Sequence, residues 1–417
     1  MSVRTVRGRV VGVAVAAAVA GTALAGPAAA ATTGQGPGQG PGQGGSGGHT
    51  ATQAAMDADV KAGVPGVLGR AQDPDGVWSG SSGVADLGTQ RPRLPQDRFR
   101  IGSITKSFVA TVLLQLEAEK KLSLDDPVEE WLPGVVHGHG HDGSRITIRG
   151  LLNHTSGIYN YTEDPGFTEK VFGKGFLEHR YDTYTPRQLV RIAMRHQPSF
   201  EPGTGWSYSN TNYVLAGMIV EKATGRSYAG EIQRRVIRPL GLRSTTLPGT
   251  SVTPPGPHGR AYSKLYDESP DATVHDVTDL NPSLAGAAGE MISSAGDLNR
   301  FYSSLLRGRL LPDRQLKEML TTVPTGEPGL DAYGLGISPM KLSCGVKVWG
   351  HGGGIHGSGS MAGATRDGRH SAAFNFNADW AGDSVAVLEA EFCGKLPEKG
   401  GAKPWPEAPA RRAAQLR

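Results

Sequence analysis

A serine and a lysine stand three residues apart in the stretch RIGSITKSF, residues 100–108. If a helix begins at Ser103, three residues make nearly one turn, so the Lys106 amine can reach the serine hydroxyl. The first turn of that helix would also offer free N–H groups and a positive dipole end to a developing oxyanion. Ordinary helix starts match so short a pattern as well, so its meaning depends on the rest of the chain.

A second candidate stretch, EPGTGWSYSN at residues 201–210, places Tyr208 and Asn210 two residues apart. In an extended chain such side chains project to the same side and can enter one cleft. Tyr208, with an ordinary pKa of about 10, becomes a useful base at neutral pH only if a positive charge such as Lys106 lowers that pKa. The Asn210 amide could hold a substrate carbonyl or the lysine. Taken alone, the stretch could equally be a loop that caps the next helix.

The third candidate stretch, WGHGGG at residues 349–354, lies at the end of a predicted strand. Glycines there would let a ligand approach the strand edge, and the Gly354 N–H could be a second oxyanion donor beside that of Ser103. His351 could donate a hydrogen bond or share a proton near neutral pH. A glycine-rich hairpin end would look the same.

The spacing of apolar residues predicts the elements that position these stretches. Apolar side chains recur every three or four residues from 108 to 116, which indicates a buried helix directly after Ser103. Further helices are predicted near residues 50–62, 147–154, 185–194, 212–222, 295–306 and 384–392, and strands near residues 67–70, 77–84, 347–349, 360–365 and 372–376. Strands at both ends of the chain predict one sheet interrupted by a helical insertion, which is an α+β fold.

The ends of the chain differ in composition from its middle. Residues 1–31 combine arginines, a short apolar run and small residues, which predicts a secretory signal peptide, a secreted protein and no stable membrane anchor. The Gly/Gln/Pro-rich residues 32–49 are predicted to be a flexible linker, and residues 396–417 a disordered tail. The remaining residues, 50–395, are predicted to form the folded domain, which is long enough to bury a sizeable core.

The charge and the histidine spacing argue against nucleic-acid binding and a metal site, and the cysteines predict a disulfide. The formal net charge of +4 includes three arginines of the predicted signal peptide, so the remaining chain is nearly neutral and unsuited to nucleic acid. Cys344 and Cys393, in an exported protein, predict a disulfide between a late strand and the last helix. The stretch HGHGHD at residues 137–142 spaces its histidines by single glycines in a loop, so no metal site is predicted there.

The three stretches in order, S-x-x-K, then Y-S-N, then H-x-G, resemble the penicillin-recognising serine hydrolases. This group includes class C β-lactamases, secreted D-alanyl-D-alanine carboxypeptidases of actinomycetes, and related esterases and D-peptidases. Segments similar to other family blocks lie at residues 151–157, 202–210, 239–242 and 289–298. The resemblance implies an antiparallel sheet flanked by helices plus an inserted, mostly helical domain, with the site in the groove between them.

The resemblance also implies a role for each residue of the three stretches. Ser103 would be the acylated nucleophile, activated by Lys106 and Tyr208, and we favour Tyr208 as the first base with Lys106 charged. The N–H groups of Ser103 and Gly354 would form the oxyanion hole. Substrate-binding roles are implied for Asn210, His351, Gly352 and Gly353.

One position departs from the family pattern. Gly352 stands where peptidases and β-lactamases of this group usually carry a hydroxyl that helps to hold the substrate carboxylate. On the nearby predicted strand only Lys341 could supply a compensating charge. A weaker grip on the carboxylate would shift the preference toward uncharged esters or amides.

The export signal and the family blocks nevertheless favour a monomeric D-Ala-D-Ala carboxypeptidase. It would act on the stem peptides of peptidoglycan through an acyl-enzyme, without a metal or organic cofactor. The alternatives are an esterase, a D-amino-acid amidase or peptidase, and a class C-like β-lactamase, so that the substrate is a small peptide, ester or β-lactam. A non-catalytic protein that binds wall peptides or β-lactams is less favoured, because Ser103, Lys106 and Tyr208 are all retained.

Overall fold

The computed structural model describes residues 48–267, 269 and 271–396. The predicted signal peptide, most of the predicted linker and nearly all of the predicted tail lie outside the described residues. Within the described ranges, no helix combines the length and the apolar character that crossing a membrane requires.

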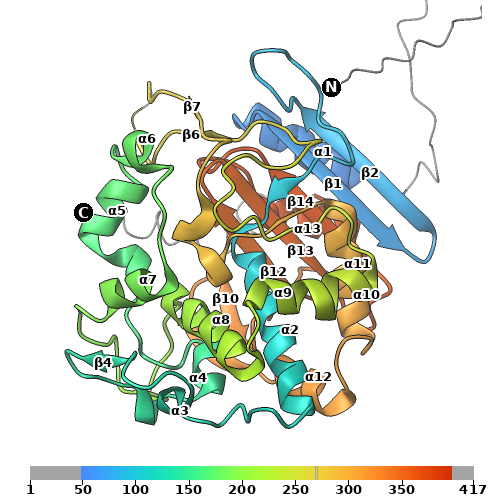
Figure 1. Ribbon diagram of the computed structural model, residues 1–417. Helices are drawn as coiled ribbons and strands as arrows, with labels where there is room; N and C mark the ends of the chain where they lie inside the picture. The colour runs from blue at the N-terminus through green and yellow to red at the C-terminus, as the bar shows by residue number, and fades with distance from the viewer. Residues whose placement is uncertain (1–47, 268, 270, 397–417) are drawn as a thin grey trace, which may run out of the picture. The chain divides into compact units, whose positions relative to one another are not determined.

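A six-stranded antiparallel sheet forms the centre of the described part (Figure 1). Its strands run in the order β11-β12-β13-β14-β1-β2, so the first two strands of the chain pair with the last one. The strands are β1 Gly66–Asp73, β2 Gly76–Gly83, β11 Ser338–Lys341, β12 Lys347–Ile355, β13 Ser358–Thr365 and β14 Ser371–Phe376. The prediction of one sheet built from both ends of the chain in an α+β fold is therefore confirmed.

Helices cover both faces of this sheet. On β14, Phe374 packs in one apolar cluster with α1 (Thr50–Lys61) and α13 (Ser384–Cys393), whereas the neighbouring Ala373 belongs to the larger core that includes α11 (Ala295–Leu306). Successive side chains of a strand point to opposite faces, so both sides of β14 are buried. This burial explains why β14 reads as a nearly continuous run of small and apolar residues rather than an alternating one.

A mostly helical region lies between β3 (Phe99–Arg100) and its antiparallel partner β8 (Ile292–Ser293). Its helices are α2 Thr105–Ala118, α3 Val128–Trp131, α4 Ile148–Leu152, α5 Pro165–Val171, α6 Phe176–His179, α7 Pro186–Ala193, α8 Asn210–Thr224, α9 Tyr228–Ile232 and α10 Arg238–Leu240. Its short strands are β4 His137–Gly138, β5 His141–Asp142, β6 Tyr262–Ser263 and β7 His275–Asp276. Helix α12 (Asp313–Leu320) and strands β9 (Val323–Glu327) and β10 (Leu330–Tyr333) then lead back to the sheet.

The chain around the nucleophile differs in detail from the prediction. Ser103 lies in a short 3-10 turn, Gly102–Ile104, and the α-helix α2 begins only at Thr105. The tighter turn arises because Gly102 is packed directly against β12, with a φ of +48°. The spacing of about one turn between Ser103 and Lys106 is kept all the same.

The two cysteines also occupy the places that the sequence indicated. Cys344 lies in the loop between β11 and β12, and it forms a disulfide with Cys393 at the end of α13. The bond therefore ties the edge of the sheet to the last helix.

Candidate active site

Strand β3 and the turn after it present Ser103 at the edge of the sheet. The backbone of Ile101 is fixed by a 2.9 Å hydrogen bond from its N–H to the Met291 carbonyl. Gly102 must be a glycine, because a Cβ there would lie 2.7 Å from the Gly354 oxygen, in a left-handed conformation that side chains disfavour. The position of Ser103 is thus set by a close approach between two backbone segments.

Lys106 connects the serine to two other parts of the chain. Its fully buried Nζ lies 3.0 Å from Ser103 Oγ, 2.7 Å from Asn210 Oδ1 and 2.8 Å from the Ala288 carbonyl oxygen. Burial holds the pKa of Lys106 well below its usual range. A charged amine would donate to all three partners, whereas a neutral amine would donate to two of them and offer its lone pair to the serine hydroxyl. The geometry therefore suits Lys106 as the base.

Tyr208 stands beside this pair. Lys106 Nζ lies 4.8 Å from the centre of the Tyr208 ring. Burial raises the pKa of Tyr208 above its usual value, against the smaller opposite effect of a hydrogen bond with Ser103. Both pKa shifts oppose our expectation of an ionised Tyr208 next to a charged Lys106. Burial disfavours the charged form of each group, so the choice of Tyr208 as the first base stays a prediction that kinetics must test.

Asn210 orients the lysine. It is the first residue of α8, and its backbone N–H donates to Asn160 Oδ1 at 3.1 Å. Its Nδ2 donates to Thr162 Oγ1 at 3.2 Å, while its Oδ1 receives the bond from Lys106. Of the two roles that the sequence left open, the structure shows the contact with the lysine, and the contact with a substrate stays a prediction.

Strand β12 brings the third stretch against the nucleophile. Its pairing with β11 ends at Gly350, and beyond that point β12 runs next to the turn that holds Ser103. A Cβ on Gly353 would lie 1.9 Å from the Ile101 carbonyl oxygen and 3.1 Å from the Ser103 nitrogen. The glycines therefore allow the backbones of Gly354 and Ser103 to meet, which is the arrangement expected of an oxyanion hole.

His351 supports this strand from inside. Its side chain is fully buried, with Nδ1 donating to the carbonyl oxygen of Gly352 and Nε2 lying 2.7 Å from the Tyr333 hydroxyl. Burial lowers the pKa of His351 to about 3. The imidazole is neutral and both its nitrogens are engaged by the protein. It cannot supply the positive charge that a basic residue would give a substrate at this position.

Lys341 does not compensate for Gly352. It is exposed at the end of β11 and lies opposite Lys347. Lys347 is five residues from Gly352 along β12, which is a distance of about 16 Å. The Lys341 charge therefore lies at the far end of the strand pair.

Aromatic residues that the motifs did not single out enclose Tyr208. The ring of His154 lies 4.4 Å from that of Tyr208 and 4.9 Å from that of Tyr333. His154 Nδ1 accepts bonds from the Ser209 backbone at 3.1 Å and from Asn212 Nδ2 at 3.2 Å. The family block at residues 151–157 was a signal for His154. No sequence pattern pointed to Tyr333, because a single tyrosine on a short strand forms no pattern.

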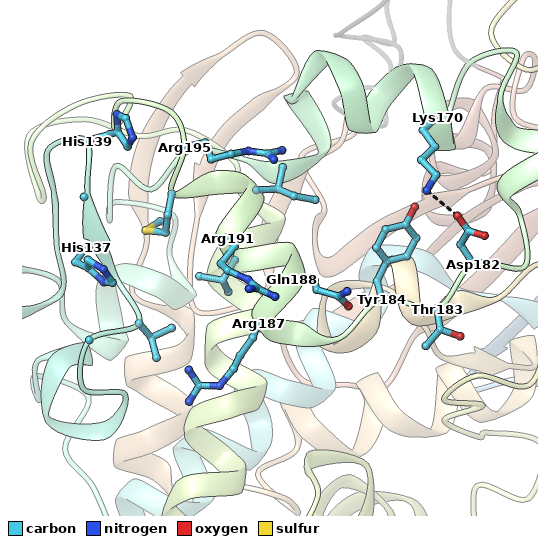
Figure 2. A pocket seen from close by; sticks show the side chains of 16 residues that line it. His137, His139, Lys170, Asp182, Thr183, Tyr184, Arg187, Gln188, Arg191 and Arg195 are labelled. Carbon is cyan, nitrogen blue, oxygen red and sulfur yellow. Dashed lines mark ion pairs between the residues drawn. The ribbon is translucent and has the colours of Figure 1, made fainter.

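A separate groove of about 1170 Å³ lies on the helical region (Figure 2). Arg187, Arg191 and Arg195, spaced along and just beyond α7, line it together with Tyr184. The β4-β5 hairpin that carries the HGHGHD stretch forms its other side. None of the predicted catalytic residues lines this groove.

Comparison with known proteins places the chain in a family. Residues 8–389 match the family model described as Beta-lactamase, so the chain belongs to the beta-lactamase family. This serine hydrolase family confirms the resemblance that the three stretches indicated.

Individual relatives carry more specific names. A solved structure of a D-stereospecific amidohydrolase from Streptomyces sp. is 61% identical, with a TM-score of 0.79, over 84% of this chain and 99% of that one. The D-amino acid amidase from Ochrobactrum anthropi SV3, complexed with L-phenylalanine amide, is 32% identical, with a TM-score of 0.70, over 82% and 94%. A D-aminopeptidase of Cereibacter sphaeroides is 28% identical over 359 residues, 84% of this chain and 64% of that protein. The chain spans less than two thirds of the length of this and other curated relatives.

Proposed function

We propose that the protein is a D-stereospecific amidohydrolase, which cleaves amides of D-amino acids through an acyl-enzyme on Ser103. The observation that carries the proposal is the 3.0 Å contact between Ser103 Oγ and the buried Lys106 amine. The similarity to the Streptomyces amidohydrolase and to the Ochrobactrum amidase supports the choice of substrate.

The proposed reaction uses the groups in their present positions. Lys106 accepts the Ser103 proton as Oγ bonds to the carbonyl carbon, and the oxyanion receives hydrogen bonds from the N–H groups of Ser103 and Gly354. When the C–N bond breaks, the proton passes through Lys106 and the neutral phenol of Tyr208 to the leaving amine. Water then attacks the ester by the reverse route, releasing the D-amino acid and restoring Ser103.

The charges around the site favour an amide over a peptide that ends in a carboxylate. His351 is neutral and Lys341 is remote, so neither holds a terminal carboxylate.

The test compares three substrates at equal concentration: D-phenylalanine amide, L-phenylalanine amide and a peptide that ends in D-Ala-D-Ala. We expect the D-amide to exceed the L-amide in kcat/KM by at least about 100-fold, or roughly 2.7 kcal/mol. Ser103→Ala should abolish the activity. Release of D-alanine faster than hydrolysis of the D-amide would move the function to a D-Ala-D-Ala carboxypeptidase.

We propose in addition that the protein acts outside the cell. The arginines, the apolar run and the small residues of positions 1–31 support this proposal. After expression of the full chain in an actinomycete host, mass spectrometry of the culture medium should find a protein that begins near residue 32. Recovery of the intact chain inside the cells alone would contradict export.

A further inference from the structure

A small cavity lies beside the strand that leads to the nucleophile. It is bordered by β3, by Ser358 at the start of β13 and by Asn375 on β14. Its volume of about 20 Å³ is enough for one species of the size of a water molecule. Its lining residues include four arginines but no aspartate or glutamate: Arg93, Arg98, Arg100 and Arg260.

Arg100 lines this cavity and carries hydrogen-bond donors without acceptors among the described residues. Its side chain is 3% exposed, and its Nη2 donates to the carbonyl oxygens of Val252, Thr278 and Leu280. Its Nε and Nη1 are buried and have no hydrogen-bond partner among the described residues. Burial lowers the pKa of Arg100 only to about 10, so the group stays charged at neutral pH.

Two neighbouring arginines share this property. Arg93 is also 3% exposed and donates through Nη1 to the Gly66 carbonyl and through Nη2 to Asn375 Oδ1. Its Nε has no hydrogen-bond partner in the described part of the chain, and the carboxylate of Asp97 lies 3.9 Å away. The Nε of Arg98 is likewise buried and unpaired within those residues.

The surrounding carboxylates do not fill the cavity. Asp97 also faces Arg91 at 3.3 Å, and Asp276 pairs with the partly exposed Arg260 at 3.3 Å. Asp279 acts on Arg100 only through its charge. Charged donors buried without acceptors are strongly unfavourable, whereas an anion in the cavity would satisfy several of them at once.

We propose that this cavity binds one small inorganic anion of the size of chloride. The anion would hold the Arg100 side chain and so help to fix β3 against the sheet. The backbone of Arg100 is already fixed there, because its carbonyl accepts a 2.7 Å bond from Ser358 Oγ. Arg100 precedes Ser103 by only three residues. One acceptor in the lining, Asn377 Oδ1, has no hydrogen-bond partner within the described ranges and would suit a water molecule. A water molecule alone is therefore the competing occupant.

Thermal unfolding of the full chain can distinguish the two occupants. Sodium chloride or bromide replaces sodium gluconate at constant ionic strength and pH. We expect the Tm to rise and saturate, by about 5 °C at a hundredfold excess over the dissociation constant. Crystals soaked in bromide should then show an anomalous peak in the cavity.

Variants keep the test specific. In Arg98→Gln, the halide concentration that gives half of the Tm shift should rise by at least tenfold. Arg300→Gln is the control, because it removes an exposed arginine of α11 that donates to two backbone carbonyls. It should leave the halide dependence of the Tm unchanged. An equal Tm in gluconate and in halide would overturn the proposal and leave water as the occupant. A bromide peak without a saturable Tm shift would mean an adventitious ion only, and would overturn it as well.

Discussion

The two halves of the active site are held in opposite ways. On one side, Lys106 is buried and held by a side-chain acceptor on Asn210 and a backbone acceptor at Ala288, which come from two distant segments. On the other side, the end of β12 contributes backbone alone, since its glycines bring main chain against main chain. The first half determines the protonation state of the reacting groups, and the second determines where a substrate carbonyl can sit.

This difference separates chemistry from substrate choice. In the proposed reaction the buried half would carry the acyl transfer at Ser103, and its hydrogen bonds are made within the protein. In the strand half, burial lowers the pKa of His351 and Lys341 lies at the far end of the strand pair, so neither side chain offers a positive charge next to Gly352. Changes in the two halves should therefore have different kinetic signatures.

The largest effect is expected from Lys106→Met. Without the amine no base faces Ser103, so kcat/KM should fall by at least about 1000-fold. The Tm should change by less than about 5 °C, because removal of a buried amine offsets the loss of a donor to Asn210 and Ala288. An amide hydrolysis assay measures kcat/KM, and a melting curve measures the Tm. A loss of less than tenfold in activity would show that another group is the base.

A smaller loss is expected from Gly353→Ala on the strand side. Its Cβ would lie 1.9 Å from the Ile101 carbonyl oxygen, so β12 and the turn at Ser103 must move apart. A shift of this kind should lower kcat by about 100-fold through a misplaced oxyanion hole. Gly166→Ala is the control, because a Cβ there meets only Asp164 at 3.4 Å. Equal activity of the two variants would contradict the close approach.

The pH dependence tests which group of the buried half is the base. Burial lowers the pKa of Lys106, so kcat/KM should rise tenfold per pH unit until the amine is neutral and then stay level. Burial raises the pKa of Tyr208, so its ionisation should add only a change in alkaline solution. Rate profiles of the wild type and of Tyr208→Phe should share the acidic limb. Its disappearance in Tyr208→Phe would instead identify the tyrosine as the base.

The smallest effect is expected from Lys341→Ala. The side chain is exposed at the far end of β11, so KM should change by less than about twofold for both an amide and a peptide that ends in a carboxylate. Lys347→Ala, the residue opposite, is the matched control. A rise in KM for the carboxylate substrate alone would restore Lys341 as a substrate-binding residue.

The sequence predicted those parts of the site that depend on local spacing. The contact of Ser103 with Lys106 follows from one turn of chain, and the apolar period from 108 to 116 marks α2. The two-ended sheet was predictable because strand-like runs bounded by turn residues occur at both ends of the chain, as at β1 and β14. The exact start of α2 was not, since the 3-10 turn at Gly102 depends on its contact with β12.

Long-range packing explains what the sequence could not predict. Asn210 lies 104 residues after Lys106 in the chain, so the sequence alone could not show that the Asn210 amide contacts the lysine. The burial that lowers the pKa of Lys106 and of His351 is a property of the folded chain only. Tyr333 contacts His351 from a strand with no recognisable pattern.

The central claim is that Ser103 becomes acylated by a D-amino acid amide. The most direct measurement is rapid acid quenching during turnover of D-phenylalanine amide, followed by mass mapping of the peptides. We expect one phenylalanyl group on the peptide that contains Ser103, and none in Ser103→Ala or with L-phenylalanine amide. Continued hydrolysis of the D-amide by Ser103→Ala, or an acyl group on a different residue, would contradict the account.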